Sequence, residues 1–187
     1  MRKTELLIPA SSLEVLKTAV IFGADAVYIG GEAFSLRAKA KNFSMEEMAQ
    51  GIVFAHEHGV KVYVTANILA HNADLEGARE YFMQLRDMKP ETPDALIISD
   101  IGVLEYAKKY APNTEIHIST QSGIVNYAAA NAFYRMGSAS NDYSLYASKN
   151  YSSSQHAKLY AKSSAGERPA YSRIAGGRKQ RDLPAVF

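Results

Sequence analysis

Five short runs of apolar residues recur along the first 137 positions of the chain. They cover residues 5–8, 26–29, 61–65, 95–98 and 115–118 and are rich in Val, Ile, Leu and Tyr, which suit pleated strands. The apolar residues follow one another instead of alternating with polar ones, so we expect both faces of each strand to be buried. Buried strands separated by roughly ten or more residues pair in parallel through crossover connections. The pattern therefore predicts an α/β fold of about five strand–helix units.

Between the runs, and after the last, apolar residues recur with the period of a helix. Ser44 opens the second helix, and Glu47 follows at the spacing of a capping box. Gly23 is placed to end the first helix, and we expect the fifth helix over residues 125–136. The N-terminal caps of the other helices are predicted from polar residues at or near their starts: Ser12, Asp74 and Asp100.

Two architectures are built from such units, an open sheet with helices on both faces and a closed barrel. A dinucleotide-binding sheet carries a Gly-x-Gly-x-x-Gly loop after its first strand, where this chain has Pro9-Ala-Ser-Ser12. We therefore favour the barrel. A complete barrel of eight units takes about 250 residues, so the five units before residue 138 predict an incomplete, TIM-barrel-like repeat.

The last part of the chain, residues 138–187, differs from the rest in composition. It holds ten serines, five tyrosines, 8 basic and 3 acidic residues, whereas the first 137 positions hold 13 basic and 16 acidic residues. Three interpretations are open: a basic arm that contacts nucleic acid or membrane, a small subdomain, or a frameshifted segment. Basic residues cluster only at Arg178, Lys179 and Arg181, and the abrupt change is typical of a shifted reading frame. We predict a partial barrel over residues 1–137, followed by a low-complexity, poorly structured tail.

Cofactor chemistry is constrained by residue types. The chain has no cysteine, which excludes disulfides and thiolate metal ligands. His56 and His58 lie two positions apart on a predicted helix and face different directions, so we interpret them as helix-end residues. No metal site is predicted.

Charge and hydropathy limit the location and the partners. The formal net charge of +2 is too close to neutral to indicate a polyanionic partner. Glu5 and Pro9 interrupt the apolar stretch near the basic start, and no run is long enough for a membrane span. We expect a cytoplasmic protein without a membrane partner.

Barrel enzymes assemble their sites at the carboxyl ends of the strands, and this chain places ionisable residues there. Glu32 follows the second strand and Asp100 the fourth, and the two could form a carboxylate pair for acid–base catalysis. His117, within the fifth strand, is a third catalytic candidate if its side chain points into the barrel. Alternatively, Asp100 is a helix cap and His117 a hydrogen-bonded core residue.

Five further residues at the same ends are candidates for substrate binding. Arg37 suits a phosphate or carboxylate, unless it lies on a solvated loop. His71 could act in acid–base chemistry or shape a turn, and the amides could bind a polar ligand or satisfy loop backbone. The set is Arg37, Asn67, His71, Gln121 and Asn126. A serine or cysteine peptidase mechanism gains no support, because the chain lacks both cysteine and a Gly-x-Ser-x-Gly motif.

Five motifs follow one another along residues 5–137: Glu5-Leu-Leu-Ile-Pro-Ala10, Gly23-Ala-Asp-Ala-Val-Tyr28, Phe34-Ser-Leu-Arg37, Pro93-Asp-Ala-Leu-Ile-Ile-Ser-Asp100 and His117-Ile-Ser-Thr-Gln121. Together they resemble peptidase family U32, the collagenase-like proteases. The resemblance implies an N-terminal barrel-like domain and a peptidase of unassigned catalytic type, here in truncated form. It also implies an alternative, because similar proteins hydroxylate RNA bases or quinone precursors without oxygen, using an iron–sulfur cluster whose cysteines lie downstream of the matched part.

Three functional hypotheses are therefore carried forward. The first is proteolysis, and the second is a part in the hydroxylation of tRNA or rRNA bases. The third is a non-catalytic module that binds RNA or a peptide. An incomplete barrel could also self-associate through its unclosed edges, and no cofactor is expected in this chain.

Overall fold

The computed structural model describes residues 5–35, 42–138, 140–141 and 172–174. Within these residues one sheet contains seven parallel strands in the order β6-β5-β4-β3-β2-β1-β7. Strands β1 to β5 follow one another in space as in sequence, so the order has no reversal of the kind that marks a doubly wound sheet. Their bounds are Glu5–Pro9, Ala26–Gly30, Lys61–Ala66, Ala95–Ile98 and Glu115–Ile118. The prediction of an incomplete, barrel-like α/β repeat is confirmed.

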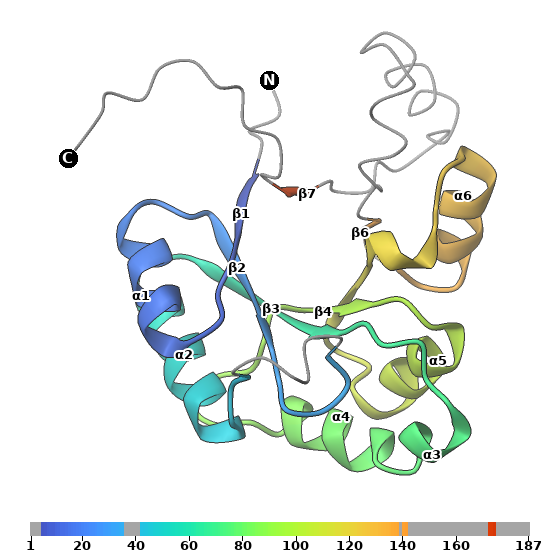
Figure 1. The fold of residues 1–187 in the computed structure, drawn as a ribbon, viewed down its shortest axis with the longest axis horizontal. Coiled ribbons are helices and arrows are strands. Elements are labelled where there is room, and N and C mark those ends of the chain that lie inside the picture. Colours follow the sequence, from blue (N-terminus) through green and yellow to red (C-terminus); the bar gives the residue numbers. More distant parts are fainter. Residues whose placement is uncertain (1–4, 36–41, 139, 142–171, 175–187) are drawn as a thin grey trace, which may run out of the picture.

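The helices lie along the outer side of the curved row of strands (Figure 1). They are α1 (Leu13–Ile21), α2 (Met45–Glu57), α3 (Asn72–Leu75), α4 (Ala78–Arg86), α5 (Ile101–Tyr110) and α6 (Tyr127–Arg135), with the 3₁₀ turn η1 at Thr120–Ser122. The caps expected at Ser12, Asp100 and the Ser44–Glu47 box are present. Gly23 has a φ of 91°, the left-handed conformation that ends α1.

Two predicted helix boundaries were wrong. The third helix is divided into α3 and α4 at Gly77, and Asp74 lies inside α3, where its Oδ2 accepts a hydrogen bond from the His71 backbone at 2.7 Å. The last helix begins at Tyr127 instead of residue 125, because the Asn126 side chain caps it. In both places a polar side chain satisfies free backbone N–H groups at a point that apolar periodicity alone does not mark.

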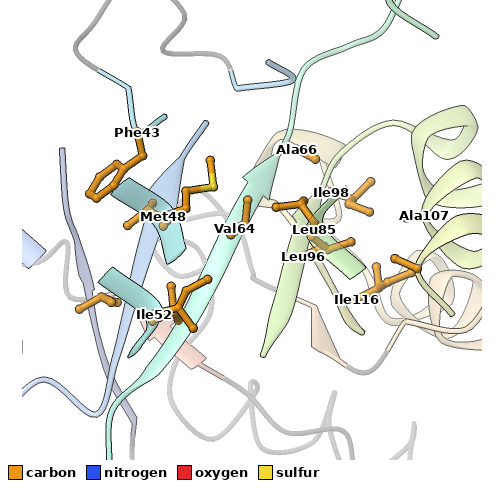
Figure 2. Packing of buried hydrophobic residues seen from close by; sticks show 14 of the residues in the cluster. Phe43, Met48, Ile52, Val64, Ala66, Leu85, Leu96, Ile98, Ala107 and Ile116 are labelled. Atoms are coloured by element: carbon orange, nitrogen blue, oxygen red, sulfur yellow. The ribbon is translucent and has the colours of Figure 1, made fainter. Parts of the chain in front are cut away.

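The main core lies between the sheet and these helices. Met48 and Ile52 of α2 lie beside Val64 of β3, and Leu85 of α4 lies beside Leu96 of β4 (Figure 2). All five side chains are at most 1% exposed, and burying one such side chain contributes about 1.5–3 kcal/mol. This layer holds the strands in place from one side only.

The opposite face of the sheet is the inner face of the partial barrel. Alternate strand residues form a second, smaller buried cluster there, made of Leu7, Ala26, Tyr63, Ala95 and Ile97. No helix of the described residues lies on this face (Figure 1), and its side chains pack on one another, as in a barrel interior. The expectation that both faces of the strands are buried is confirmed for these residues.

Most of the predicted tail, residues 142–171 and 175–187, lies outside the described residues. The described part of it contains two short parallel strands, β6 (Ser140–Asn141) beside β5 and β7 (Ser172–Ile174) beside β1. We had predicted no strand after residue 137, and this was wrong for the five residues of β6 and β7. Their extended conformation is stabilised by pairing with a neighbouring strand and not by local strand propensity. The boundary at residue 137 and the frameshift interpretation remain predictions. No helix among the described residues is long and apolar enough to cross a membrane.

Candidate functional site at the carboxyl ends of the strands

Small hydroxyl residues line the inner face where the strands end. In a strand, alternate residues point to the same face, so Thr65, Ser99 and Ser119 continue the inner rows of β3, β4 and β5. Ile98 and Ile118 are paired in register, and the Ser119 N–H donates to the Ile98 carbonyl at 2.8 Å, which brings Ser99 and Ser119 side by side. All three hydroxyl residues are buried. The ends of three strands thus present one continuous polar edge.

The segment after β2 adds a fourth hydroxyl group to this edge. The Oγ of Ser35 lies 3.4 Å from Oγ1 of Thr65, which also donates to the Ile29 carbonyl at 3.2 Å. Ser35 occupies the place that a side chain on Gly30 would take, since a Cβ built there meets Ser35 Oγ at 2.6 Å. A side chain at Gly30 would therefore force the Ser35 side chain out of this position.

Phe34 anchors the same segment. Its φ is 60°, a left-handed conformation that non-glycine residues seldom adopt. The Phe34 ring packs against Tyr81 and Phe82 at centroid distances of 5.2 and 6.1 Å. The conformation directs the ring into the outer core while the next residue, Ser35, enters the inner face. Arg37, predicted to bind an anion, lies outside the described residues, so its role stays a prediction.

Gln121 is held by two serine hydroxyls. Ser99 Oγ donates to Oε1 of Gln121 at 3.3 Å, and Ser119 Oγ donates to the same oxygen at 3.1 Å. The Gln121 residue itself is exposed. The sequence indicated that Gln121 stands at the edge, but the two hydroxyl groups that hold its amide were missed. The period-two continuation of strands β4 and β5 was the signal that could have found them.

His117 lies on the inner face, as the catalytic hypothesis requires. It is 5% exposed, its ring meets the Tyr63 ring edge-on at 4.7 Å, and its Nε2 lies 3.5 Å from Oε2 of Glu115. Its Nδ1 is buried without a hydrogen-bond partner in the described part of the chain. A buried polar atom of this kind is costly unless something pairs with it, which makes His117 Nδ1 an exception among the buried polar atoms of the described residues.

Tyr63 closes the inner face below His117. Its hydroxyl donates to the Glu5 carboxylate at 2.9 Å, which links β3 to β1 across the interior. Burial, together with the charge of Glu5, raises the pKa of the tyrosine well above its usual range. The hydroxyl therefore stays protonated and keeps its hydrogen bond to Glu5. The aromatic ring of Tyr63 packs beneath the polar edge, against His117.

The predicted carboxylate pair is not joined in the structure. Asp100 Oδ1 accepts a hydrogen bond from the Val103 N–H at 3.0 Å, so this side chain caps α5, the alternative given above. Glu32 is exposed, and no hydrogen bond or ion pair links it to Asp100. The catalytic roles of Glu32 and Asp100 stay predictions.

The remaining candidates are dispersed around the edge. His71 is exposed and precedes α3, and Asn67 is half-buried just beyond β3. Asn126 Oδ1 accepts from the Ala129 N–H at 2.9 Å and so serves as a helix cap. The structure brings Gln121 and His117 to the end of one strand, and the substrate roles of His71, Asn67 and Asn126 stay predictions.

A further polar group occurs at the opposite end of the sheet. His56, in the last turn of α2, contacts Glu91 through Nδ1 and Asp94 through Nε2, the latter at 2.8 Å. Burial alone would lower the pKa of His56, but the hydrogen bonds and charges of Asp94 and Glu91 outweigh it and raise the pKa above its ordinary value. His56 is a helix-end residue, as interpreted, and its two carboxylate partners are an addition to that interpretation.

Residues 11–140 match the model of peptidase family U32. The chain is 45% identical over 128 residues to a tRNA hydroxylation protein of Bacillus subtilis, a match that covers 68% of this chain and 30% of that protein. It is 40% identical over 122 residues to a 23S rRNA 5-hydroxycytidine synthase of Escherichia coli, covering 65% and 18% of the two chains. The chain thus spans less than a third of the length of either relative.

The fold has a counterpart among solved structures. A U32 peptidase of known structure superposes with a TM-score of 0.67 at 16% identity, over 90% of this chain and 68% of the other. At this identity the likeness concerns the fold alone. It agrees with the succession of parallel strands and outer helices described above.

Proposed function

Because the chain belongs to peptidase family U32, we propose that it takes part in the hydroxylation of an RNA base, with tRNA as its first candidate substrate. The observation that carries the proposal is the 45% identity to a tRNA hydroxylation protein. A second relative, the rRNA 5-hydroxycytidine synthase, also acts on a base in RNA. The family resemblance led us to expect proteolysis first, and these relatives favour the alternative.

The groups at the polar edge support a binding role for an RNA base. Hydroxyl, amide and imidazole groups can donate or accept hydrogen bonds to the edges of a base without carrying a formal charge. Acyl transfer by a serine peptidase instead needs a serine hydrogen-bonded to a base such as histidine, and among the described residues no serine is hydrogen-bonded to a histidine. The chemistry of the edge therefore favours recognition of a neutral heterocycle over cleavage of a peptide.

The hydroxylation step itself needs a redox group that this chain does not fit. Iron–sulfur clusters are held by cysteine thiolates, and the chain has none. Within the described residues, no three His, Asp or Glu side chains lie close enough together to bind a metal. We therefore assign to this chain the binding of the substrate, with the redox chemistry supplied from elsewhere.

A chimera tests this proposal. Residues 11–140 of this chain replace the matching segment of the Bacillus protein, and the product is expressed in a strain that lacks its own tRNA hydroxylation protein. Mass spectrometry of tRNA nucleosides is expected to detect the restored hydroxylated base. A folded chimera that leaves the tRNA unhydroxylated contradicts the proposal. A parallel assay of the complete chain on gelatin and casein tests the peptidase hypothesis, which cleavage of either protein would support.

A further inference from the structure

Two cations lie over one tyrosine ring where α4 and α5 pack against each other (Figure 1). The guanidinium carbon of Arg79 lies 5.8 Å from the centroid of the Tyr110 ring, and the Nζ of Lys109 lies 5.2 Å from the same centroid. Both cations are exposed, whereas Tyr110 is half-buried. Arg86 of α4 also donates to the Tyr110 carbonyl at 3.3 Å, which joins the two helices at this place. We call Arg79, Lys109 and Tyr110 the Tyr110 patch.

The neighbouring carboxylates do not neutralise the two cations of the Tyr110 patch. Asp87 pairs with Arg86, and Glu105 pairs with Lys108 at 2.9 Å. Glu80 lies in the first turn of α4, and within the described residues neither it nor any other carboxylate forms an ion pair with a cation of the patch. In this part of the chain, two positive charges therefore stand beside one aromatic ring without a carboxylate partner.

The stability of the fold does not explain the position of Arg79. It is the second residue of α4, and the positive end of the helix dipole disfavours a cation in the first turn. The exposed contact with the Tyr110 ring is favourable by a similarly small amount, so the two effects largely cancel. Lys109 differs, because it lies in the last turn of α5, where the dipole favours a cation. Helix electrostatics therefore explain Lys109 but not Arg79.

An anion that approaches the Tyr110 patch meets two positive charges at once. A guanidinium group binds phosphate through two parallel N–H donors, and the ammonium group beside it adds a second charge. The ring of Tyr106, one turn earlier on α5, has its centroid 5.7 Å from that of Tyr110. Surfaces that bind RNA strands combine cations with aromatic rings in this way. The chemistry of the patch therefore fits the sugar–phosphate backbone of RNA.

We propose that the Tyr110 patch binds phosphate groups of the substrate RNA, at a place separate from the polar edge that receives the base. The choice of RNA as the ligand rests on the proposed function. Arg79 and Lys109 contact the phosphates, and Tyr110 is the positioning residue that holds the two cations beside each other. Because phosphate contacts carry no sequence information, the patch adds affinity and orientation and no base preference.

Fluorescence anisotropy of a labelled, unmodified tRNA transcript measures this contribution on the complete chain. Each phosphate contact contributes about 0.7–0.9 to the slope of log Kd against log salt concentration. Arg79→Gln and Lys109→Gln are each expected to lower the slope by about that amount and to weaken binding about five- to eightfold at about 0.1 M salt. The double variant should lower the slope by about twice as much. Thermal denaturation confirms that each variant folds.

Lys17→Gln is the matched control for the loss of charge. Lys17 of α1 places its Nζ 5.4 Å from the centroid of the Phe54 ring, and in the described residues it is the single cation over that ring. The change thus removes the same charge from the same kind of contact, and it should leave the slope unaltered. If Lys17→Gln lowers the slope as much as Lys109→Gln does, the effect belongs to the total charge of the protein and the proposal is overturned.

Two variants of Tyr110 test its positioning role. Tyr110→Leu removes the ring under the cations and is expected to weaken binding of the transcript about two- to fivefold. Tyr110→Phe keeps the ring and should bind like wild type. Equal binding by the two folded variants would contradict the positioning role, since a ring that holds the cations should matter for their contact with phosphate.

The outcomes separate this inference from the proposed function. An unchanged slope in folded Arg79→Gln or Lys109→Gln overturns the inference, while binding of the transcript by wild type still supports the proposed function. If wild type does not bind the transcript but the chimera restores hydroxylation, the inference alone is overturned. Failure in both assays overturns both. Lower slopes in both variants, with an unaltered slope in Lys17→Gln, support both.

Discussion

His56 connects α2 to the segment before β4, and this connection should make the stability of the protein depend on pH. Its two ring nitrogens contact Glu91 and Asp94, and Asp94 Oδ2 also accepts the Val62 N–H at 2.7 Å. The imidazolium form donates to both carboxylates at once, whereas the neutral ring has one N–H and can donate to only one of them. Protonation therefore strengthens the connection.

The direction of the pH dependence follows from the raised pKa of His56. A group whose pKa is higher in the folded state stabilises the fold fully below its unfolded pKa, which is about 6.5 for histidine. The stabilisation is then lost as the pH rises from that value through the folded pKa. We expect the contribution of His56 to be largest near pH 6 and to decrease through the neutral and weakly alkaline range.

The size of the effect is limited by solvent. The side chains of His56, Asp94 and Glu91 are 20%, 32% and 47% exposed, so both ion pairs are partly screened. Exposed ion pairs contribute about 0.2–1 kcal/mol each, and two of them give a total of about 1 kcal/mol. For a chain of this length, that corresponds to a change of about 2–4 °C in Tm.

Thermal and urea denaturation of wild type and His56→Ala between about pH 6 and pH 9 measure this contribution. The difference in unfolding free energy should be about 1 kcal/mol at the acidic end and should decrease toward the alkaline end. His71→Ala is the control, since this exposed histidine should show little difference at any pH. A difference that is constant with pH, or one that grows as the pH rises, would refute the reasoning.

Three further changes test the polar edge and its surroundings. Gly30→Ala places a Cβ 2.6 Å from Ser35 Oγ and should lower the free energy of unfolding by about 1–3 kcal/mol in a denaturant titration. Gly77→Ala, whose Cβ would meet nothing within 4 Å, should not destabilise the protein. Equal effects of the two changes would contradict the crowding argument. Asp100→Ala removes a helix cap and should lower the free energy of unfolding by about 1 kcal/mol, while Asp100→Asn, which can also cap, should be about as stable as wild type. If the Bacillus chimera with Asp100→Asn is stable but no longer hydroxylates tRNA, the result would instead support a catalytic carboxylate. Arg37→Ala should weaken RNA binding without lowering Tm, and the slope of log Kd against log salt concentration should fall by about one, as for the loss of one phosphate contact. A variant that loses both RNA binding and thermal stability would indicate a structural role.

The strands and caps could be predicted because their determinants are local. Runs such as residues 95–98 contain no polar residue and stand at intervals that only a crossover helix can fill. Ser44 and Glu47 are three residues apart, so their reciprocal hydrogen bonds follow from helix geometry alone. The apolar runs and the cap spacings were therefore enough to predict the order of strands and helices.

Contacts between residues far apart in the sequence could not be predicted in the same way. Ser99 and Gln121 are 22 residues apart, and His56 and Asp94 are 38 residues apart, so their contacts depend on how separate units pack. From the sequence, Asp100 was both a catalytic candidate and a helix cap. Only the structure shows the hydrogen bond from the Val103 N–H that establishes its capping role. Strand β7 pairs with β1, more than 160 residues away, without an apolar run of its own.

The two outermost strands of the described sheet have a consequence for assembly. Strand β6 has two residues and β7 has three, whereas the five strands between them have four to six. Within the described residues, β6 and β7 offer a second copy only two and three backbone positions to pair with, and short outer strands are a common protection against intermolecular pairing. If copies of this chain associate, we therefore expect contacts between side chains and not a continuous intermolecular sheet, so that such assemblies should dissociate on dilution instead of growing into fibres.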